Sequence, residues 1–90
     1  MPTPIRQARI PAEHWDAAYA AAEPGVTGAT LVADHGDPSQ NEMLEPFTYE
    51  FNGRTYAAWM LWSSACGVES IIGADDAAEW MAEARKARAA

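Results

Sequence analysis

The stretch FTYEFNGRTYAAWML, residues 47–61, sets the topology of the chain because it places Asn52-Gly53 between two runs of β-prone residues. A two-residue Asn-Gly loop favours the type I′ turn, whose twist matches that of the strands in a β-hairpin. The turn also fixes the register, so that Tyr49 faces Tyr56 across the hairpin. We therefore predict a hairpin centred on this turn.

Directly paired residues share a face of a sheet, so the register divides the side chains of the hairpin into two sets. The apolar set is expected to form the core side, onto which one or both helices pack: Phe47, Tyr49, Phe51, Tyr56, Ala58, Met60 and Trp62. The other set begins polar near the turn and becomes apolar away from it: Thr48, Glu50, Thr55, Ala57, Trp59 and Leu61.

The residues before the hairpin predict a helix over 11–22, a short strand over 29–34 and a loop over 35–46. Pro11 suits a first helical turn, and Pro24-Gly25 ends the helix. The loop is rich in turn residues and contains two prolines. Four residues at helical spacing are expected on the buried face of the first helix: Trp15, Ala18, Tyr19 and Ala22.

The residues after the hairpin predict a turn over 63–67, a strand over 68–72 that Gly73 ends, and a helix over 76–88. Asp76 followed three residues later by Glu79 resembles a capping box. The expected inner face of this helix consists of Ala77, Trp80, Met81 and Ala84.

These elements predict one small α+β domain over residues 1–90. Its parts are an N-terminal arm (1–10), an N-terminal helix, a three- or four-stranded, mostly antiparallel sheet with the Asn-Gly hairpin at its centre, and a C-terminal helix. The single Cys66 cannot form an internal disulfide, which is typical of a reduced intracellular protein. No run approaches the ~20 apolar residues of a membrane helix, and the N-terminus lacks the apolar centre of a secretory signal. We expect a cytoplasmic protein that binds no membrane, in the host cell cytoplasm if a phage encodes it.

Charge is distributed very unevenly along the chain. All thirteen acids lie between Glu13 and Glu83, where Arg54 is the only Lys or Arg, so residues 10–84 carry thirteen negative charges against one positive charge, a balance of −12. Such a field repels nucleic acid and attracts a protein with a basic surface. We therefore expect no direct binding to nucleic acid.

Two groups of residues have the side chains of a reactive site. Cys66, Ser63 or Ser64 with His14 or His35 would make a nucleophile and base, but nothing in the sequence brings them together. The cluster around Asp34, His35 and Asp37 has ligand types that suit a divalent ion, but it fits no calcium loop and is good turn chemistry. We predict no catalytic residue, no metal and no cofactor.

The acids of the loop, the hairpin and the last helix are the predicted partner-binding site. Asp76, Glu79 and Glu83 follow i, i+3, i+7 and so line one side of a helix. Trp59 is included because, with Leu61, it forms an exposed aromatic anchor unless a helix, the loop at 34–46 or a second copy of the chain covers it. The predicted site is Asp34, Asp37, Glu42, Glu45, Glu50, Trp59, Asp76, Glu79 and Glu83.

A small chain that is acidic through its middle and ends GADDAAEWMAEARKAR resembles the small acidic anti-defence proteins of phages and mobile elements, in particular anti-CRISPR proteins. The resemblance implies a protein inhibitor that blocks the nucleic-acid channel of a Cas effector complex. The resemblance rests on the small size of the chain, on its acidic middle and on the acidic helix from Asp75-Asp76 to Glu83. The basic RKAR at 85–88 departs from a purely acidic mimic and favours a mixed interface that includes Trp59 or Trp80.

The sequence therefore predicts a non-enzymatic domain that binds a basic, nucleic-acid-binding surface and inhibits it. One alternative is a small homodimeric ligand-binding or enzymatic domain with an aromatic pocket formed by Trp59, Tyr56 and the His35 region. Another is a structural or assembly component of a larger particle.

Overall fold

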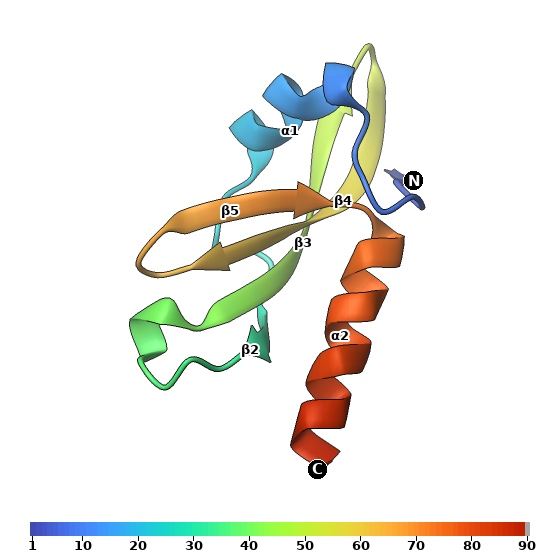
Figure 1. Ribbon diagram of the computed structural model, residues 1–90. Helices are drawn as coiled ribbons and strands as arrows, with labels where there is room; N and C mark the ends of the chain where they lie inside the picture. The colour runs from blue at the N-terminus through green and yellow to red at the C-terminus, as the bar shows by residue number, and fades with distance from the viewer. Residues whose placement is uncertain (90) are drawn as a thin grey trace.

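The computed structural model describes residues 1–89 and has two helices and a curled mixed sheet of five strands (Figure 1). The strands are β1 (Thr3–Pro4), β2 (Thr30–Ala33), β3 (Glu42–Phe51), β4 (Arg54–Ser63) and β5 (Gly67–Ile72). The helices are α1 (Trp15–Ala21), preceded by the 3₁₀ turn η1 (Ala12–His14), and α2 (Ala74–Ala89). A second 3₁₀ turn, η2 (Pro38–Gln40), lies between β2 and β3. The predicted α+β class is confirmed, although the sheet has one or two strands more than expected.

The Asn-Gly hairpin has the predicted turn and register. Asn52 and Gly53 have φ angles of 50° and 77°, the two positive values that a type I′ turn requires. Tyr49 pairs with Tyr56, and the β3–β4 ladder continues without a shift as far as the pair Met43–Trp62. The other edge of β4 pairs with β1 near the turn and with β5 farther along. β4 therefore pairs with three strands, β1, β3 and β5.

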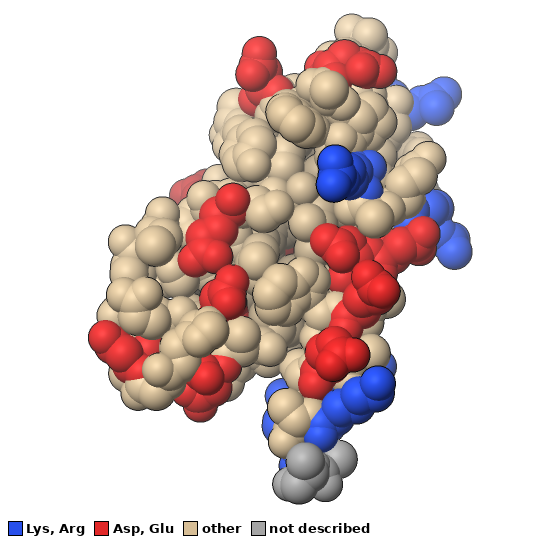
Figure 2. Space-filling model, in the orientation of Figure 1, with Lys and Arg blue, Asp and Glu red and all other residues tan. Residues whose placement is uncertain are grey.

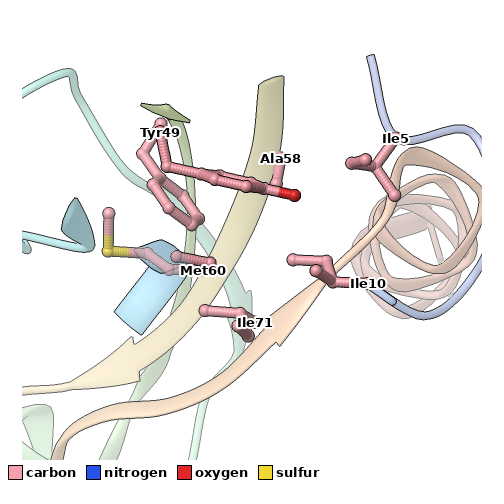
Figure 3. Close-up of a cluster of buried hydrophobic side chains, with 8 residues drawn as sticks. Ile5, Ile10, Tyr49, Ala58, Met60 and Ile71 are labelled. Atoms are coloured by element: carbon pink, nitrogen blue, oxygen red, sulfur yellow. The ribbon is translucent and has the colours of Figure 1, made fainter. Parts of the chain in front are cut away.

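The predicted core face of the hairpin carries the first of two hydrophobic clusters. Phe47, Tyr49, Ala58 and Met60 pack there with Ala18 of α1 and with three isoleucines from outside the hairpin. Figure 3 shows two of these, Ile5 and Ile10, pointing toward the strands from the N-terminal segment. The predicted arm is thus packed into the domain along part of its length.

The opposite face of the sheet carries the second cluster. Leu44, Leu61 and Ile72 pack there against Ala77 and Ala84 of α2, and Trp59 and Trp80 lie half-buried at its margin. Each helix therefore covers its own face of the sheet, with α2 covering Leu61 and much of Trp59. Coverage by a helix, one of the outcomes that the sequence left open for Trp59 and Leu61, is therefore the one observed, and the predicted inner face of the last helix is confirmed.

Three local predictions are wrong. The predicted loop 35–46 ends early, because β3 begins at Glu42 and includes Pro46. Proline is tolerated there because the pairing of β2 with β3 ends at Leu44, two residues before Pro46. The Pro46 carbonyl points away from β4 and accepts a bond from Thr27 Oγ1. No neighbouring strand therefore needs the N–H that Pro46 lacks.

The second correction concerns α2, which begins at Ala74, so Asp76 lies inside its first turn and is not the cap. The third concerns α1. Ala18 is fully buried, but the Trp15 and Tyr19 side chains are 49% and 47% exposed. Because Ala17 and Ala18 are small, α1 sits close to the sheet on its alanine side, and the two aromatics lie beside the contact.

Gly73 joins β5 to α2 at a point where the N-terminal segment crosses. Its N–H donates to Ala8 O at 2.9 Å, and Ala74 N–H donates to Ile5 O at 2.7 Å. A Cβ at residue 73 would overlap the backbone carbonyl of Gln7. The crossing therefore requires glycine for space.

We predict that Gly73→Ala lowers the free energy of unfolding by about 3 kcal/mol, because a packed backbone has to move. Urea unfolding followed by tryptophan fluorescence measures the loss. Gly36→Ala is the matched control, because no atom lies within 4 Å of its added Cβ and only its positive φ of 86° opposes alanine. Equal losses in the two variants would contradict the crowding at Gly73.

Candidate functional site

The acids at 34–50 do not form one surface. Glu42 and Glu50 lie at opposite ends of β3, about 26 Å apart at the usual rise of a strand. Asp34 and Asp37 lie near the Glu42 end, whereas Glu50 lies beside the hairpin turn. The fold therefore separates the members of the predicted acidic surface.

Several of these acids already have partners within the chain. Asp34 Oδ1 accepts a bond from Gly36 N–H, and Asp37 Oδ1 accepts bonds from Ser39 N–H and Oγ, the expected turn contacts. Glu42 Oε1 lies 2.9 Å from His35 Nε2. Asp34 and Asp37 are exposed, but their positions are explained by the loop itself.

Glu45 corrects the prediction most clearly, because this residue is fully buried and lies on the core face of the hairpin. Its Oε1 accepts bonds from Gly25 N–H at 2.8 Å and Trp62 Nε1–H at 3.0 Å. Its Oε2 accepts a bond from Thr27 N–H at 2.8 Å and lies 3.0 Å from Thr27 Oγ1, whose single proton is shared with the Pro46 carbonyl. The carboxylate thus fastens the segment after α1 to the sheet and is unavailable to a partner.

The environment of Glu45 sets its protonation. Burial acts to raise the pKa, but the bonds from Gly25, Thr27 and Trp62 favour the ionised form and together lower the pKa of Glu45 below its usual value. A charge without a cation is tolerated in the interior here because three N–H groups and the Thr27 hydroxyl surround it.

The acids of α2 do come together, as predicted. At 100° per residue, Asp75, Asp76, Glu79 and Glu83 fall within an arc of about 100°, on the side away from the buried Ala77 and Ala84. We call this set the acidic face of α2. Figure 2 shows acidic side chains following the helix, with basic side chains at its C-terminal end and others beside its start.

The acidic face has little compensation within the chain. Across residues 1–89, the only ion pair of a Lys or Arg with an acid is that of Glu83 with Lys86, whose N and O atoms lie 3.7 Å apart. Both side chains of this pair are at least 74% exposed, and such pairs contribute little. The helix dipole favours Asp75 and Asp76 in the first turn but does not extend to Glu79.

Trp80 adds an apolar element to the acidic face. A surface depression is lined by Asp76, Glu79, Trp80, Ala82 and Glu83. The half-buried indole of Trp80 is anchored in the second cluster, so its remaining surface is held in a fixed place among the carboxylates. Trp80, which the prediction named only as an alternative to Trp59, is therefore the aromatic residue that accompanies the acids.

The side chains that could have formed a nucleophile and base lie apart from one another. His14 is buried with its Nδ1 2.8 Å from the Tyr49 hydroxyl, in an aromatic cluster with Phe51 and Tyr56. Burial and the neighbouring Tyr56 raise the pKa of Tyr49. Cys66 lies in the exposed β4–β5 turn, and no hydrogen bond joins its thiol to an imidazole in the part of the chain that the structure describes. No group of three or more potential metal ligands is found within residues 1–89.

The pocket proposed in the ligand-binding alternative does not form. Tyr56 and Trp59 lie on opposite faces of β4, and His35 lies beyond the far end of the hairpin, after β2. Sequence reasoning also missed a groove beside α1, which is lined in part by Trp15 and Tyr19.

Comparisons of the chain with protein-family models, curated protein sequences and solved structures give no match. Neither helix, over the residues described, is long and apolar enough to cross a membrane.

We predict that Glu45→Gln lowers the free energy of unfolding at neutral pH by about 2 kcal/mol, because the NH₂ end of the amide would face N–H donors that the carboxylate accepts from. The folded-state pKa is lowered, so the contribution of Glu45 is fully present above the unfolded-state pKa and is lost as pH falls through the folded value. The difference between wild type and variant in urea unfolding should therefore shrink below about pH 4. The exposed Glu50→Gln is the control, and a pH-independent difference would contradict this role.

Proposed function

We propose that the protein is a non-enzymatic binding domain that docks the acidic face of α2 onto a cationic, nucleic-acid-binding surface of another protein and thereby inhibits it. One observation carries the proposal: four carboxylates share one side of α2, and Glu79 has no cationic partner within the described residues. A structural role accounts for Glu45, Asp34 and Asp37, and the helix dipole favours Asp75 and Asp76, but neither explains why Glu79 and Glu83 continue the same face.

The spacing of these carboxylates suits a surface that binds phosphates. At 1.5 Å per residue, Asp76 and Glu79 are offset by about 4.5 Å along the helix axis, and Glu79 and Glu83 by about 6 Å. Along the axis of a DNA duplex, successive phosphates of one strand are offset by about 3.4 Å. The acidic face therefore offers a somewhat sparser line of negative charge, held on a rigid helix, that a groove lined with Lys and Arg can bind.

The length of the acidic face limits the kind of partner. Arg85, Lys86 and Arg88 follow the last acid, so the negative line extends over little more than two helical turns. A cationic pocket or a short channel matches this length better than a long duplex groove. Trp80 supplies an apolar anchor within the same face.

The resemblance to anti-CRISPR proteins gives the most specific form of the proposal, in which the partner is a Cas effector complex and the docked face blocks its nucleic-acid channel. The acidic face lies on the helix that carries this resemblance. In this form, the protein and the nucleic acid compete for the same channel of the partner.

The proposal is tested with purified nucleic-acid-binding complexes, including Cas effector complexes, that are retained on the immobilised protein. We expect the affinity of a retained complex to fall more than tenfold between about 50 and 200 mM salt, and its nucleic acid to compete with the protein. Glu79→Gln/Glu83→Gln should weaken binding by about tenfold, because Gln keeps the helix propensity of Glu but removes the charge.

The matched control is Glu23→Gln/Glu50→Gln, which removes the same charge from exposed positions outside α2 and should change the affinity by less than about twofold. An affinity that ignores salt, or equal weakening by the two double variants, would contradict the proposed face.

A further inference from the structure

A groove outside the acidic face separates α1 from the end of β5. Its volume is about 380 Å³, and it is lined by the N-terminal segment from Ala8 to Ile10, by Trp15 and Tyr19, by the end of β5 and by Asp76. Trp15 and Tyr19 are 49% and 47% exposed, although both are large and apolar. Trp15 Nε1–H donates to Ile10 O at 2.8 Å, so the indole is held in one orientation. The groove thus has fixed aromatic walls that are open to solvent.

The neighbouring strand β5 has a free edge. β5 pairs with β4 on one side, and on the other side its only partner among the described residues is Arg9, which bridges to Ile72 at the end of the strand. Gly73 N–H, just beyond, is taken by Ala8 O. The pairing of β4 with β5 is irregular at Glu69, which is an extra residue on β5. No strand among the described residues pairs with Gly67–Ile71 on the outer side, and such an edge is a template for another strand.

The charge on β5 decides which strand fits. Glu69 is exposed in the middle of β5. A second copy of the chain, paired antiparallel through the same edge, would bring two Glu69 carboxylates close together, which opposes that pairing. A strand from another protein with Lys or Arg near Glu69 has the opposite, favourable charge.

We propose that the free edge of β5 and the adjoining groove bind an extended, basic segment of a partner protein by strand addition. The segment adds a strand beside Gly67–Ile71, places an apolar side chain between Trp15 and Tyr19, and places a basic side chain near Glu69. Arg9 occupies the Ile72 end of the groove, so the basic side chain belongs outside the groove, beside Glu69, which lines a separate depression with His35, Gln40 and Glu42. Main-chain bonds supply affinity in this mode, and the groove supplies selectivity.

This surface is separate from the acidic face of α2 except for Asp76, which borders both. The peptide experiment below can therefore fail while the acidic face still functions, and the reverse also holds.

The test uses the acetylated, amidated peptide TKVKFKT, which alternates basic and other side chains, and the ¹⁵N-labelled protein. We expect NMR shift changes at the backbone amides of residues 67–71 and at the Trp15 indole N–H. The control peptide has the same sequence with methyl groups on the backbone nitrogens of its central residues. It keeps every charge and side chain but cannot pair as a strand, so it should not bind.

Two variants locate the contacts. Tyr19→Ala should weaken binding of TKVKFKT by about tenfold, because it removes one wall of the groove from a helix that tolerates alanine. Glu69→Lys should weaken binding by about fivefold, whereas Glu50→Lys, an equal change of charge at an exposed strand position near the hairpin turn, should have little effect.

Three results would overturn the proposal. The first is no shift change at about 1 mM peptide, and the second is equal binding of the methylated peptide. The third is concentration-dependent dimerisation, measured by sedimentation, that protects the amides of 67–71 from exchange without any peptide. That last result would identify a second copy of the chain as the occupant.

Discussion

The ladder between β3 and β4 is the constraint on which the rest of the structure depends. The Asn52-Gly53 turn fixes its register, and the register assigns each side chain of both strands to one of two faces. α1 and the N-terminal segment pack on one face, and α2 packs on the other. A slip by one residue would turn Glu45 away from its donors and move Leu61 away from α2. Leu61 packs against Ala77 and Ala84 of α2, so the acidic face, on the other side of the helix, points outward. Its direction thus depends on the register of β3 and β4.

Much of the fold could be predicted from the sequence, because the signals were local. An Asn-Gly turn and alternation in the flanking strands are sufficient to pair Tyr49 with Tyr56 and to collect the apolar face. The predictions failed where contacts with residues far away in the sequence determine the local structure. Pro46 lies in a strand because β2 stops short of it, and Trp15 and Tyr19 are exposed because alanines bring α1 close to the sheet. Neither reason is visible within a short window of sequence.

The candidate site was predictable in part for the same reason. Asp76, Glu79 and Glu83 share a helix side because helical spacing alone places them there, but the acids at 34–50 scatter because an extended strand carries them apart. Glu45 could have been recognised as inward-facing, since it lies two residues before Phe47 and so shares its face. The donors that make its burial possible come from the segment after α1, which nothing in the sequence connects to Glu45. The acids of the predicted site thus divide into the turn contacts of Asp34 and Asp37, the contact of Glu42 with His35, the buried anchor Glu45, the separate Glu50, and the acidic face of α2.

The most direct measurement of the central claim is zero-length carbodiimide cross-linking of the protein to the complex that it retains, followed by mass spectrometry. The reagent joins a carboxylate to a lysine only where the two are in contact. The account predicts cross-links from Glu79 and Glu83 to lysines of the partner's nucleic-acid-binding surface, and their loss when nucleic acid is added first. Cross-links that arise instead from Glu50, or that persist with nucleic acid bound, would contradict it.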